Sequence, residues 1–262
     1  MIDTHAHLDF ADFDLDRDSL IKKCARDGIT IINPGTDFTT SKNAVDLAQD
    51  YENIYASVGL HPENIEYSFS KKRDVILEKD FDFKKYYELA KSKKVLAIGE
   101  AGLDFWKQPK GIEKRKTFQS KQKEIFLKQI DLAEDLNLPL IIHCRNAFDE
   151  LFDILKQRKT RGVIHCFTGN LEQSQRFLDL GYYLGINGII FKLDLTDVIK
   201  VCPMERILLE TDCPFLSPPG FEQRNSPLAL PIIASKIADV KNMTINDVVQ
   251  VTEINAKNLF NC

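Results

Sequence analysis

Short apolar segments recur along the chain and are closed by Gly, Pro or polar clusters, with stretches of helical spacing between them. Several are continuously apolar rather than alternating, as over residues 140–142, which is typical of strands in a parallel sheet covered on both faces. Eight such segments occur, over residues 2–10, 28–37, 54–64, 95–105, 138–147, 162–170, 182–190 and 206–218.

The intervening pieces carry a period of about 3.6 residues, most clearly over residues 119–139, where Ile125, Phe126 and Ile130 fall on one helix face. Pro139 indicates that this helix has already ended. Eight strands alternating with helices predict a (β/α)8 TIM barrel. The alternative, an open doubly wound sheet, has no support from a nucleotide-binding motif, since "GEAGLD" lacks the GxGxxG spacing.

The length of 262 residues fits one barrel domain over residues 1–262. Two stretches read as irregular connections: a charged one over residues 68–94 and a Pro-rich one over residues 213–231. The sequence contains no internal repeat. We expect one domain with elaborated loops.

Composition narrows the class of protein. Hydrophobic residues make up 44% and charged residues 28%, as in a soluble globular protein. With no apolar run of about 18 residues and no secretory layout at the start, we expect no membrane partner and a cytoplasmic or nuclear location. The six cysteines form no CxxC pair and read as reduced. A net charge of -4 means that any nucleic-acid contact needs a local basic patch.

Metal-ligand side chains close most of the predicted strands, and the strand ends are where a barrel of this kind carries its active site. These residues are His5, His7, Glu100, His143, His165 and Asp212. His5 and His7 are two positions apart, so they point to the same side of their strand and can hold one ion. Any one of them alone could be a satisfied structural residue, but their joint placement favours a metal site.

Four imidazoles and two carboxylates exceed the three protein ligands of a usual single catalytic zinc. The set is large enough for two divalent ions that share a carboxylate. Paired ions of this kind act on phosphoester or amide centres, so the sequence predicts a binuclear hydrolase.

Further polar residues in the same segments have two interpretations each. His61 could bind a substrate phosphate, orient a ligand or fix its loop, and Arg145 could meet a phosphate or form an ion pair. Asp9 and Asp104 could orient imidazoles that hold metal, or could cap helices. Cys144 and Cys166 directly follow predicted ligands, so strand alternation predicts that both face the helices.

The motifs "THAHLD", "GLHPEN", "GEAGLDF", "LPLIIHCRNA", "HCFTGN", "ETDCPFLSP" and "RNSP" resemble, in order and spacing, those of the TatD family of metal-dependent deoxyribonucleases. The resemblance runs from the first strand to the final helices. It implies a TIM barrel that hydrolyses DNA phosphodiester bonds, often as a 3′-to-5′ exonuclease, with two Mg²⁺, Mn²⁺ or Zn²⁺ ions.

By this resemblance, His5 and His7 hold one ion, His143 and His165 the other, Glu100 lies between the ions, and Asp212 lies beside the attacking water.

The resemblance also implies that Arg224 contacts substrate. The chain departs from the family pattern around it, having Gln223 and Ser226 nearby, and has Glu63 where a second histidine is common. These departures concern substrate contacts outside the metal core.

A basic loop follows the fourth predicted strand and includes Lys114, Arg115 and Lys116 near the only tryptophan, Trp106. Cations beside an aromatic ring are what binding of single-stranded DNA needs. The alternative is a solvated helix start with Trp106 as a lid over the core.

The sequence thus predicts a metal-dependent deoxyribonuclease, in which Asp212 and Glu100 act in catalysis and His61, Arg145, Trp106 and Arg224 contact substrate. One rival is an amidohydrolase acting on a small amide, lactone or ester, and the other is a non-catalytic metal-binding scaffold. The physiological metal, the choice of DNA or RNA, exo or endo action, the biological role and the oligomeric state stay open, with a monomer as the simplest case.

Overall fold

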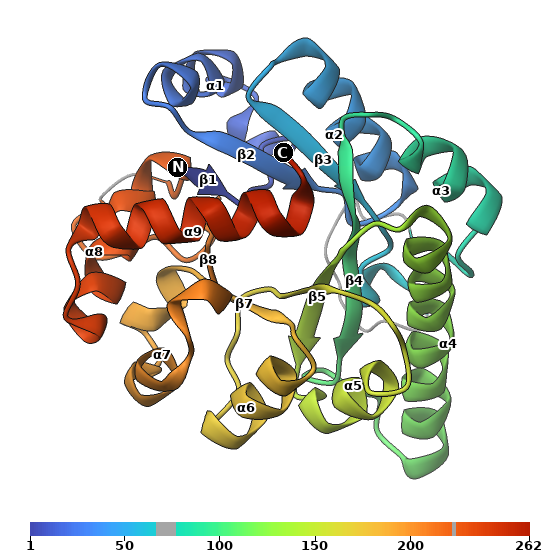
Figure 1. Ribbon diagram of the computed structural model, residues 1–262. Helices are drawn as coiled ribbons and strands as arrows, with labels where there is room; N and C mark the ends of the chain where they lie inside the picture. Colours follow the sequence, from blue (N-terminus) through green and yellow to red (C-terminus); the bar gives the residue numbers. More distant parts are fainter. Residues whose placement is uncertain (67–76, 222–223) are drawn as a thin grey trace.

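The structure, a computed structural model, describes residues 1–66, 77–221 and 224–262. Eight parallel strands pair in chain order, and helices follow them around the outside (Figure 1). The strands are β1 Ile2–Asp3, β2 Thr30–Pro34, β3 Ile54–Val58, β4 Val95–Asp104, β5 Leu140–Arg145, β6 Gly162–Ile164, β7 Tyr183–Ile186 and β8 Ile207–Leu209. Each of the eight predicted segments contains one strand.

The seam between β1 and β8 closes the barrel. Ala6 and Cys213 form a parallel bridge just beyond the two strands. The Asp3 carboxylate accepts hydrogen bonds from the backbone N–H and the hydroxyl of Thr211, at 2.9 and 2.6 Å. The predicted TIM barrel is confirmed, and the first and last strands meet as the open sheet would not allow.

The helices between the strands follow from local signals as well as from hydrophobic spacing. They are α1 Arg17–Arg26, α2 Phe38–Asp50, α3 Phe83–Ala90, α4 Ile112–Leu136, α5 Phe148–Leu155, α6 Leu171–Asp179, α7 Thr196–Val201, α8 Leu230–Lys241 and α9 Ile245–Phe260. The longest, α4, ends at Asn137, whose left-handed backbone (φ 52°) caps it before Pro139.

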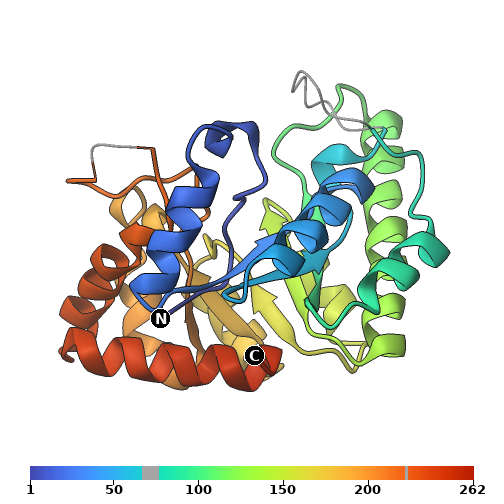
Figure 2. The same cartoon turned by 90° about the horizontal axis from the view of Figure 1, so that it is seen from above.

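The core has two parts. A large cluster of buried side chains fills the space between the strands and the surrounding helices. A smaller one fills the barrel interior with residues such as Ile32, Ile141 and Leu208, and it includes Leu259 and Phe260 of α9. Figure 2 shows α9 across one end of the barrel, while the loops that follow the strands gather at the other end. The interior is therefore free for polar side chains only at the carboxyl ends of the strands.

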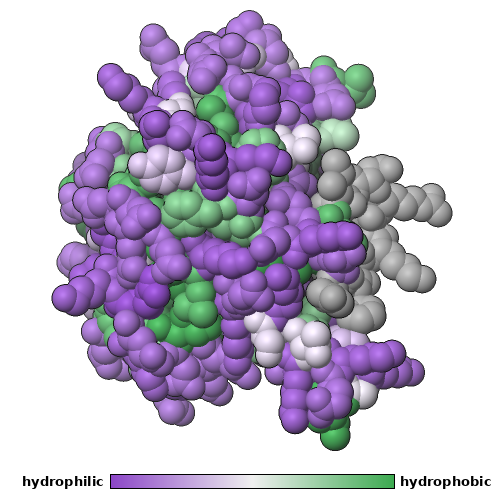
Figure 3. All heavy atoms as spheres, turned by 90° about the vertical axis from the view of Figure 1, so that its right-hand side faces the viewer, coloured by the Kyte–Doolittle hydropathy of each residue, from purple (hydrophilic) through white to green (hydrophobic). Residues whose placement is uncertain are grey.

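The two stretches expected to be irregular differ. The charged stretch contains α3, whose Tyr86 is fully buried, so the expectation of an irregular connection was wrong there. The side that carries α3 and α4 is mostly hydrophilic, with hydrophobic atoms in small separate patches (Figure 3). The helix nevertheless has a sequence signal, because Phe83, Tyr86 and Tyr87 are spaced to lie on one helix face. Part of the same stretch, residues 68–76, lies outside the described residues.

In its described residues, 213–221 and 224–226, the Pro-rich stretch has no helix or strand before the short helix Pro227–Ala229, and α8 follows at Leu230. All six cysteines, which lie within the described ranges, are free thiols, as expected. Among the helices of the described ranges, we find none with both the length and the apolar content needed to cross a bilayer.

Candidate metal centre

The β1–β8 seam brings the first and last predicted ligands together. The Asp212 N–H donates to the His5 carbonyl at 2.8 Å, and the His7 N–H donates to the Cys213 carbonyl at 2.9 Å. His5 and His7 are buried, and their Nε2 atoms lie 3.2 Å apart. The pair therefore faces one point inside the barrel mouth, as the two-residue spacing predicted.

Glu100, at the inside of β4, is the centre of the cluster. Its Oε2 lies 3.3 Å from His5 Nε2 and 3.7 Å from His7 Nε2. Its Oε1 lies 2.9 Å from His143 Nδ1 and 4.0 Å from His165 Nε2. The two oxygens of one carboxylate thus face two different sets of imidazoles.

Burial raises the pKa of Glu100, but the surrounding imidazoles outweigh it and hold the pKa well below the usual value. The carboxylate is 4% exposed. It is therefore a buried anion whose neighbours are nitrogen donors.

His143 lies between two carboxylates. Its Nδ1 faces Glu100, and its Nε2 lies 3.0 Å from Asp104 Oδ2. Burial lowers the pKa of His143, but the hydrogen bonds to Asp104 and Glu100 dominate and raise it to about 10. The close approach of β4 to β5 depends on Gly102 (φ 149°), because a Cβ there would lie 2.0 Å from the His143 carbonyl oxygen.

His165 and Asp212 complete the six predicted residues. The His165 ring stacks on the His5 ring with centroids 3.4 Å apart. Asp212 Oδ1 lies 3.7 Å from His7 Nε2 and 3.8 Å from His165 Nε2. Its side chain, at 15% exposure, is more exposed than that of Glu100 at 5%. Burial raises the pKa of Asp212 to about 6.

The prediction missed Glu210, which is fully buried beside the cluster. Its Oε1 lies 3.0 Å from His165 Nδ1 and accepts hydrogen bonds from the Cys166 N–H at 2.7 Å and the Asn187 amide at 3.0 Å. Burial raises its pKa to about 7. Space for it depends on Gly185, where a Cβ would lie 2.3 Å from Glu210 Oε2.

A sequence signal for Glu210 existed. It precedes Asp212 by two positions, so the alternation used for His5 and His7 would have placed both acids on the same side.

Cys166 does not face the helices, so that prediction was wrong for this residue. Its sulfur and the ligand atoms of His165 and Asp212 all lie within 4.8 Å of one another. Strand β6 ends at Ile164 and Cys166 has φ 44°, so strand alternation does not apply to it. Cys144, which lies within β5, is buried in the hydrophobic core as predicted.

His61 lies inside the cluster. Its Nε2 is 3.3 Å from Glu100 Oε1, and its Nδ1 accepts a hydrogen bond from the Glu63 N–H at 3.0 Å. Its ring centroid lies 4.3 Å from that of His143. Of the interpretations left open for His61, this position suits orientation of the predicted ligand Glu100 and stabilisation of the loop after β3.

Arg145 and Trp106 lie together at the rim. The Arg145 guanidinium lies 4.6 Å from the centre of the Trp106 ring, which is 54% exposed. Within the described ranges we find no ion pair for Arg145, so its cation faces an aromatic ring instead. Lys114, Arg115 and Lys116 are exposed on the first turns of α4, where Lys116 pairs with Glu113.

Two predicted residues have partners outside the cluster. The Asp9 carboxylate accepts a hydrogen bond from the Asn33 amide at 2.8 Å, where an imidazole was expected. Arg224 pairs with the Asp16 carboxylate at 2.8 Å and donates to the Asp12 carbonyl, so it joins the loop after β8 to the loop after β1. Gln223 lies outside the described residues.

The chemistry of the donor set fits divalent cations. Four carboxylates line the cluster: Glu100, Asp104, Glu210 and Asp212. Within the described parts of the chain, their ion-pair partners are histidines alone, without a Lys or Arg. Buried carboxylates without a fixed cation are costly, and mixed imidazole and carboxylate donors suit Zn²⁺ or Mn²⁺.

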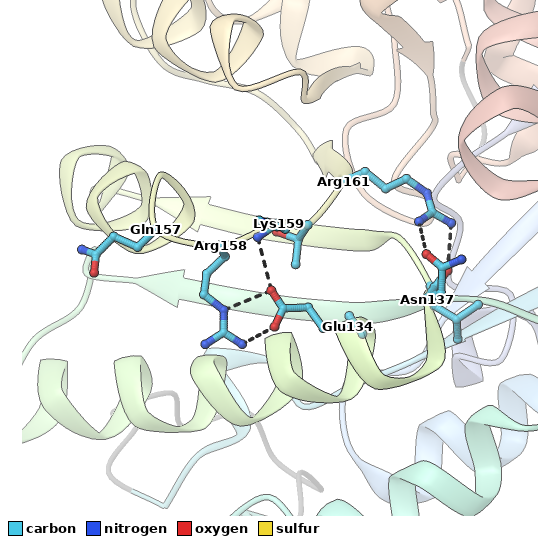
Figure 4. Close-up of a pocket in the computed structure, with 9 residues that line it drawn as sticks. Glu134, Asn137, Gln157, Arg158, Lys159 and Arg161 are labelled. Atoms are coloured by element: carbon cyan, nitrogen blue, oxygen red, sulfur yellow. Dashed lines mark hydrogen bonds and ion pairs between the residues drawn. The ribbon is translucent and has the colours of Figure 1, made fainter.

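A second polar site lies at the opposite end of the barrel, where α4 ends and β6 begins (Figure 4). Arg158 pairs there with Asp131 and with Glu134 at 2.6 Å. Arg161 donates to the side-chain and backbone oxygens of Asn137, both at 2.8 Å. Glu134, Arg158 and Arg161 therefore already have polar partners in this pocket.

Comparison with known proteins finds a family and relatives that match this chain over nearly its whole length. Residues 2–261 match the family of TatD related DNases. The chain is 37% identical over 270 residues to the uncharacterized metal-dependent hydrolase YabD of Bacillus subtilis, a match that covers 99% of this chain and 98% of the relative. It is 31% identical over 274 residues to the 3′-5′ ssDNA/RNA exonuclease TatD of Escherichia coli, with 99% and 98% covered.

Among solved structures, the crystal structure of YjjV, a TatD homolog from Escherichia coli, superposes with a TM-score of 0.85 at 31% identity. The match covers 100% of this chain and 98% of the other.

Proposed function

This chain belongs to the TatD related DNase family, and we propose that it is a metal-dependent hydrolase that removes nucleotides from the 3′ end of single-stranded DNA or RNA. The observation that carries the proposal is the position of Glu100 between two sets of imidazoles. Such a carboxylate is what a pair of ions needs as a bridge, and paired ions suit displacement at phosphorus.

The residues that would hold the ions fall into two groups. His5 and His7 face one oxygen of Glu100, and His143 and His165 face the other, with His61 beside them. Divalent ions bound in such a site lower the pKa of water and neutralise charge that develops on phosphate oxygens.

The side chains around these groups have separate tasks. Asp212 is the more solvent-exposed carboxylate of the mouth, so it is the group that positions the attacking water and accepts its proton. Asp104 orients His143 by a hydrogen bond to its Nε2, and the Glu210 carboxylate orients His165 through its charge, 3.0 Å from the Nδ1 atom. Arg145 holds a phosphate oxygen at the rim.

The proposed substrate explains the basic rim of an acidic protein. Trp106 follows β4, Arg145 ends β5 and the cations lie on the first turns of α4, all at the same end of the barrel as the cluster. A phosphate backbone that tracks these cations would bring an unpaired base to Trp106.

The test is digestion by protein that has been stripped with a chelator and reloaded with Mg²⁺, Mn²⁺ or Zn²⁺. Single-stranded DNA, duplex DNA and single-stranded RNA, each labelled at the 5′ or the 3′ end, serve as substrates. We expect products that shorten from the 3′ end of single strands, and about two ions per chain by elemental analysis. Glu100→Gln should lose both activity and ions, while the matched Glu134→Gln at the opposite end should keep both.

The rivals give different results. Turnover of small amides, lactones or esters without any cleavage of nucleic acid would favour the amidohydrolase. Absence of both bound ions and turnover after reloading would favour the scaffold.

A further inference from the structure

Two phenylalanine rings form a wall beside the candidate metal centre. The Phe10 ring, on the loop after β1, stacks on the His7 ring with centroids 4.6 Å apart and planes at 20°. The Phe215 ring, on the loop after β8, meets Phe10 edge-on at 6.2 Å and His7 at 6.4 Å. Phe215 is 46% exposed. The rings therefore run from a candidate ligand out to solvent.

Arg17 and Asn225 hold the backbone of the two loops that carry Phe10 and Phe215. Arg17 donates to the carbonyl oxygen of Phe10 at 2.9 Å and to that of Leu8 at 2.6 Å. Asn225, itself buried, donates to the carbonyl oxygens of Phe215 and of Thr211. Little conformational entropy would thus be lost when a ligand covers the rings, which favours binding.

Arg224 joins the two loops that carry these rings. Its guanidinium lies 3.9 Å from the centre of the Phe13 ring, three positions after Phe10, and pairs with Asp16. This contact holds the Phe10 loop and the Phe215 loop in one arrangement.

The wall faces a second aromatic group across the barrel. Trp106 follows β4 and Phe215 follows β8, and these strands are four places apart in the order of eight. The candidate centre lies between them, inside the barrel mouth. A chain of nucleotides that places a phosphate at the centre would thus have an aromatic surface on either side.

We propose that Phe10 and Phe215 form a stacking platform for the nucleobase next to the phosphate that is cleaved. The inference rests on the proposed function and specifies its substrate as nucleic acid with unpaired bases. Every base has a π-face, so the platform accepts all bases alike. A base inside a duplex is covered by its neighbours, so the platform selects against duplex substrate.

A matched pair of substrates isolates the base. One is a single-stranded oligothymidylate, and the other is an oligomer of the same length built from abasic tetrahydrofuran sugar phosphates. For the wild-type protein we expect kcat/KM to be at least about tenfold higher on oligothymidylate, within the range of one stacked base.

Phe215→Leu keeps an apolar cover but removes the π-face. It should lower kcat/KM on oligothymidylate about tenfold, mainly through KM, and leave the abasic oligomer unchanged, and Phe215→Trp should restore the value. Leu15→Ala, which removes an exposed apolar side chain from the Phe10 loop, is the control and should leave both substrates unchanged. Thermal melting checks that each variant folds.

An equal loss on both substrates would mean that Phe215 only shields the centre, and no loss on either would mean that the base does not reach it. Either result overturns the platform. Failure of the wild-type protein to cleave either substrate would instead overturn the proposed function. Binding of labelled oligothymidylate in EDTA, read by anisotropy, gives a second measure without catalysis, and Phe215→Leu should weaken it several-fold.

Discussion

Both ends of the barrel carry glutamates beside basic side chains, but the glutamates differ in burial and in their ion-pair partners. At the carboxyl end, Glu100 is buried among imidazoles, and the described contacts give it no Lys or Arg. At the amino end, Glu134 is paired with Arg158 and is partly exposed. A folded chain tolerates unbalanced buried acids only where something else compensates, so the difference separates a ligand site from a structural ion-pair network.

His143→Ala, at the carboxyl end, is expected to have the largest effect on activity of the variants that test this difference between the two ends. We expect kcat/KM on single-stranded DNA to fall by about a thousandfold or more, because loss of a bound ion removes several kcal/mol of transition-state stabilisation. The melting temperature should stay within a few degrees of the wild-type value, since the variant removes a polar group from a crowded cluster. Activity retained in a sample whose metal content has been measured would remove His143 from the ligand set.

Glu210→Gln tests whether the carboxylate that the sequence prediction missed contributes to metal binding. The amide keeps the shape of the side chain but loses the charge that faces His165 Nδ1, so metal affinity should fall about 10- to 100-fold. Competition with a chelating dye measures the affinity. Glu205→Gln, an exposed neighbour before β8, is the control, and equal affinities for the two variants would limit Glu210 to packing.

Arg158→Met tests the amino end of the barrel, where we expect an effect on stability and not on activity. Removing the partner of Asp131 and Glu134 should lower the free energy of unfolding by about 1 kcal/mol and the melting temperature by about 2–4 °C. Nuclease activity should stay within about twofold of wild type. A large loss of activity at unchanged melting temperature would show that the two ends are not separate in function.

The smallest effect is expected for Arg145→Lys. Lysine keeps the positive charge but cannot lie flat on Trp106, so KM for single-stranded DNA should rise about threefold with kcat unchanged. Arg115→Lys, which retains charge elsewhere in the basic patch, should leave KM unchanged. A change in kcat instead of KM would place Arg145 at the reacting phosphate.

The strand count and the metal cluster were accessible from sequence because both depend on short-range patterns. His5 and His165 stand just beyond their strands, as predicted. Glu100 and His143 were expected to close β4 and β5 but lie inside them, because these strands continue to Asp104 and Arg145. The parallel barrel then brings these ends together, so a list along the chain becomes a cluster in space. Residue roles in catalysis stay predictions.

Other features depend on backbone turns or distant partners that a sequence pattern does not carry. Cys166 has a positive φ that turns its sulfur toward the cluster, against strand alternation. Arg224 meets Asp16 through contact between two loops more than 200 positions apart. Helix α3 is different, because Phe83, Tyr86 and Tyr87 carry a helical spacing that the expectation of an irregular connection overlooked.

The seam between β1 and β8 also couples the predicted metal site to closure of the barrel. Thr211 and Asp3, which hold the seam, are 208 positions apart, so the first predicted ligands in chain order meet the last one only where the barrel closes. His5 and His7 follow β1 and Asp212 follows β8, so the pairing of all eight strands brings the three side chains together. A partly assembled barrel should therefore lack the predicted metal site, and chelation of bound ions should lower the stability of the whole barrel.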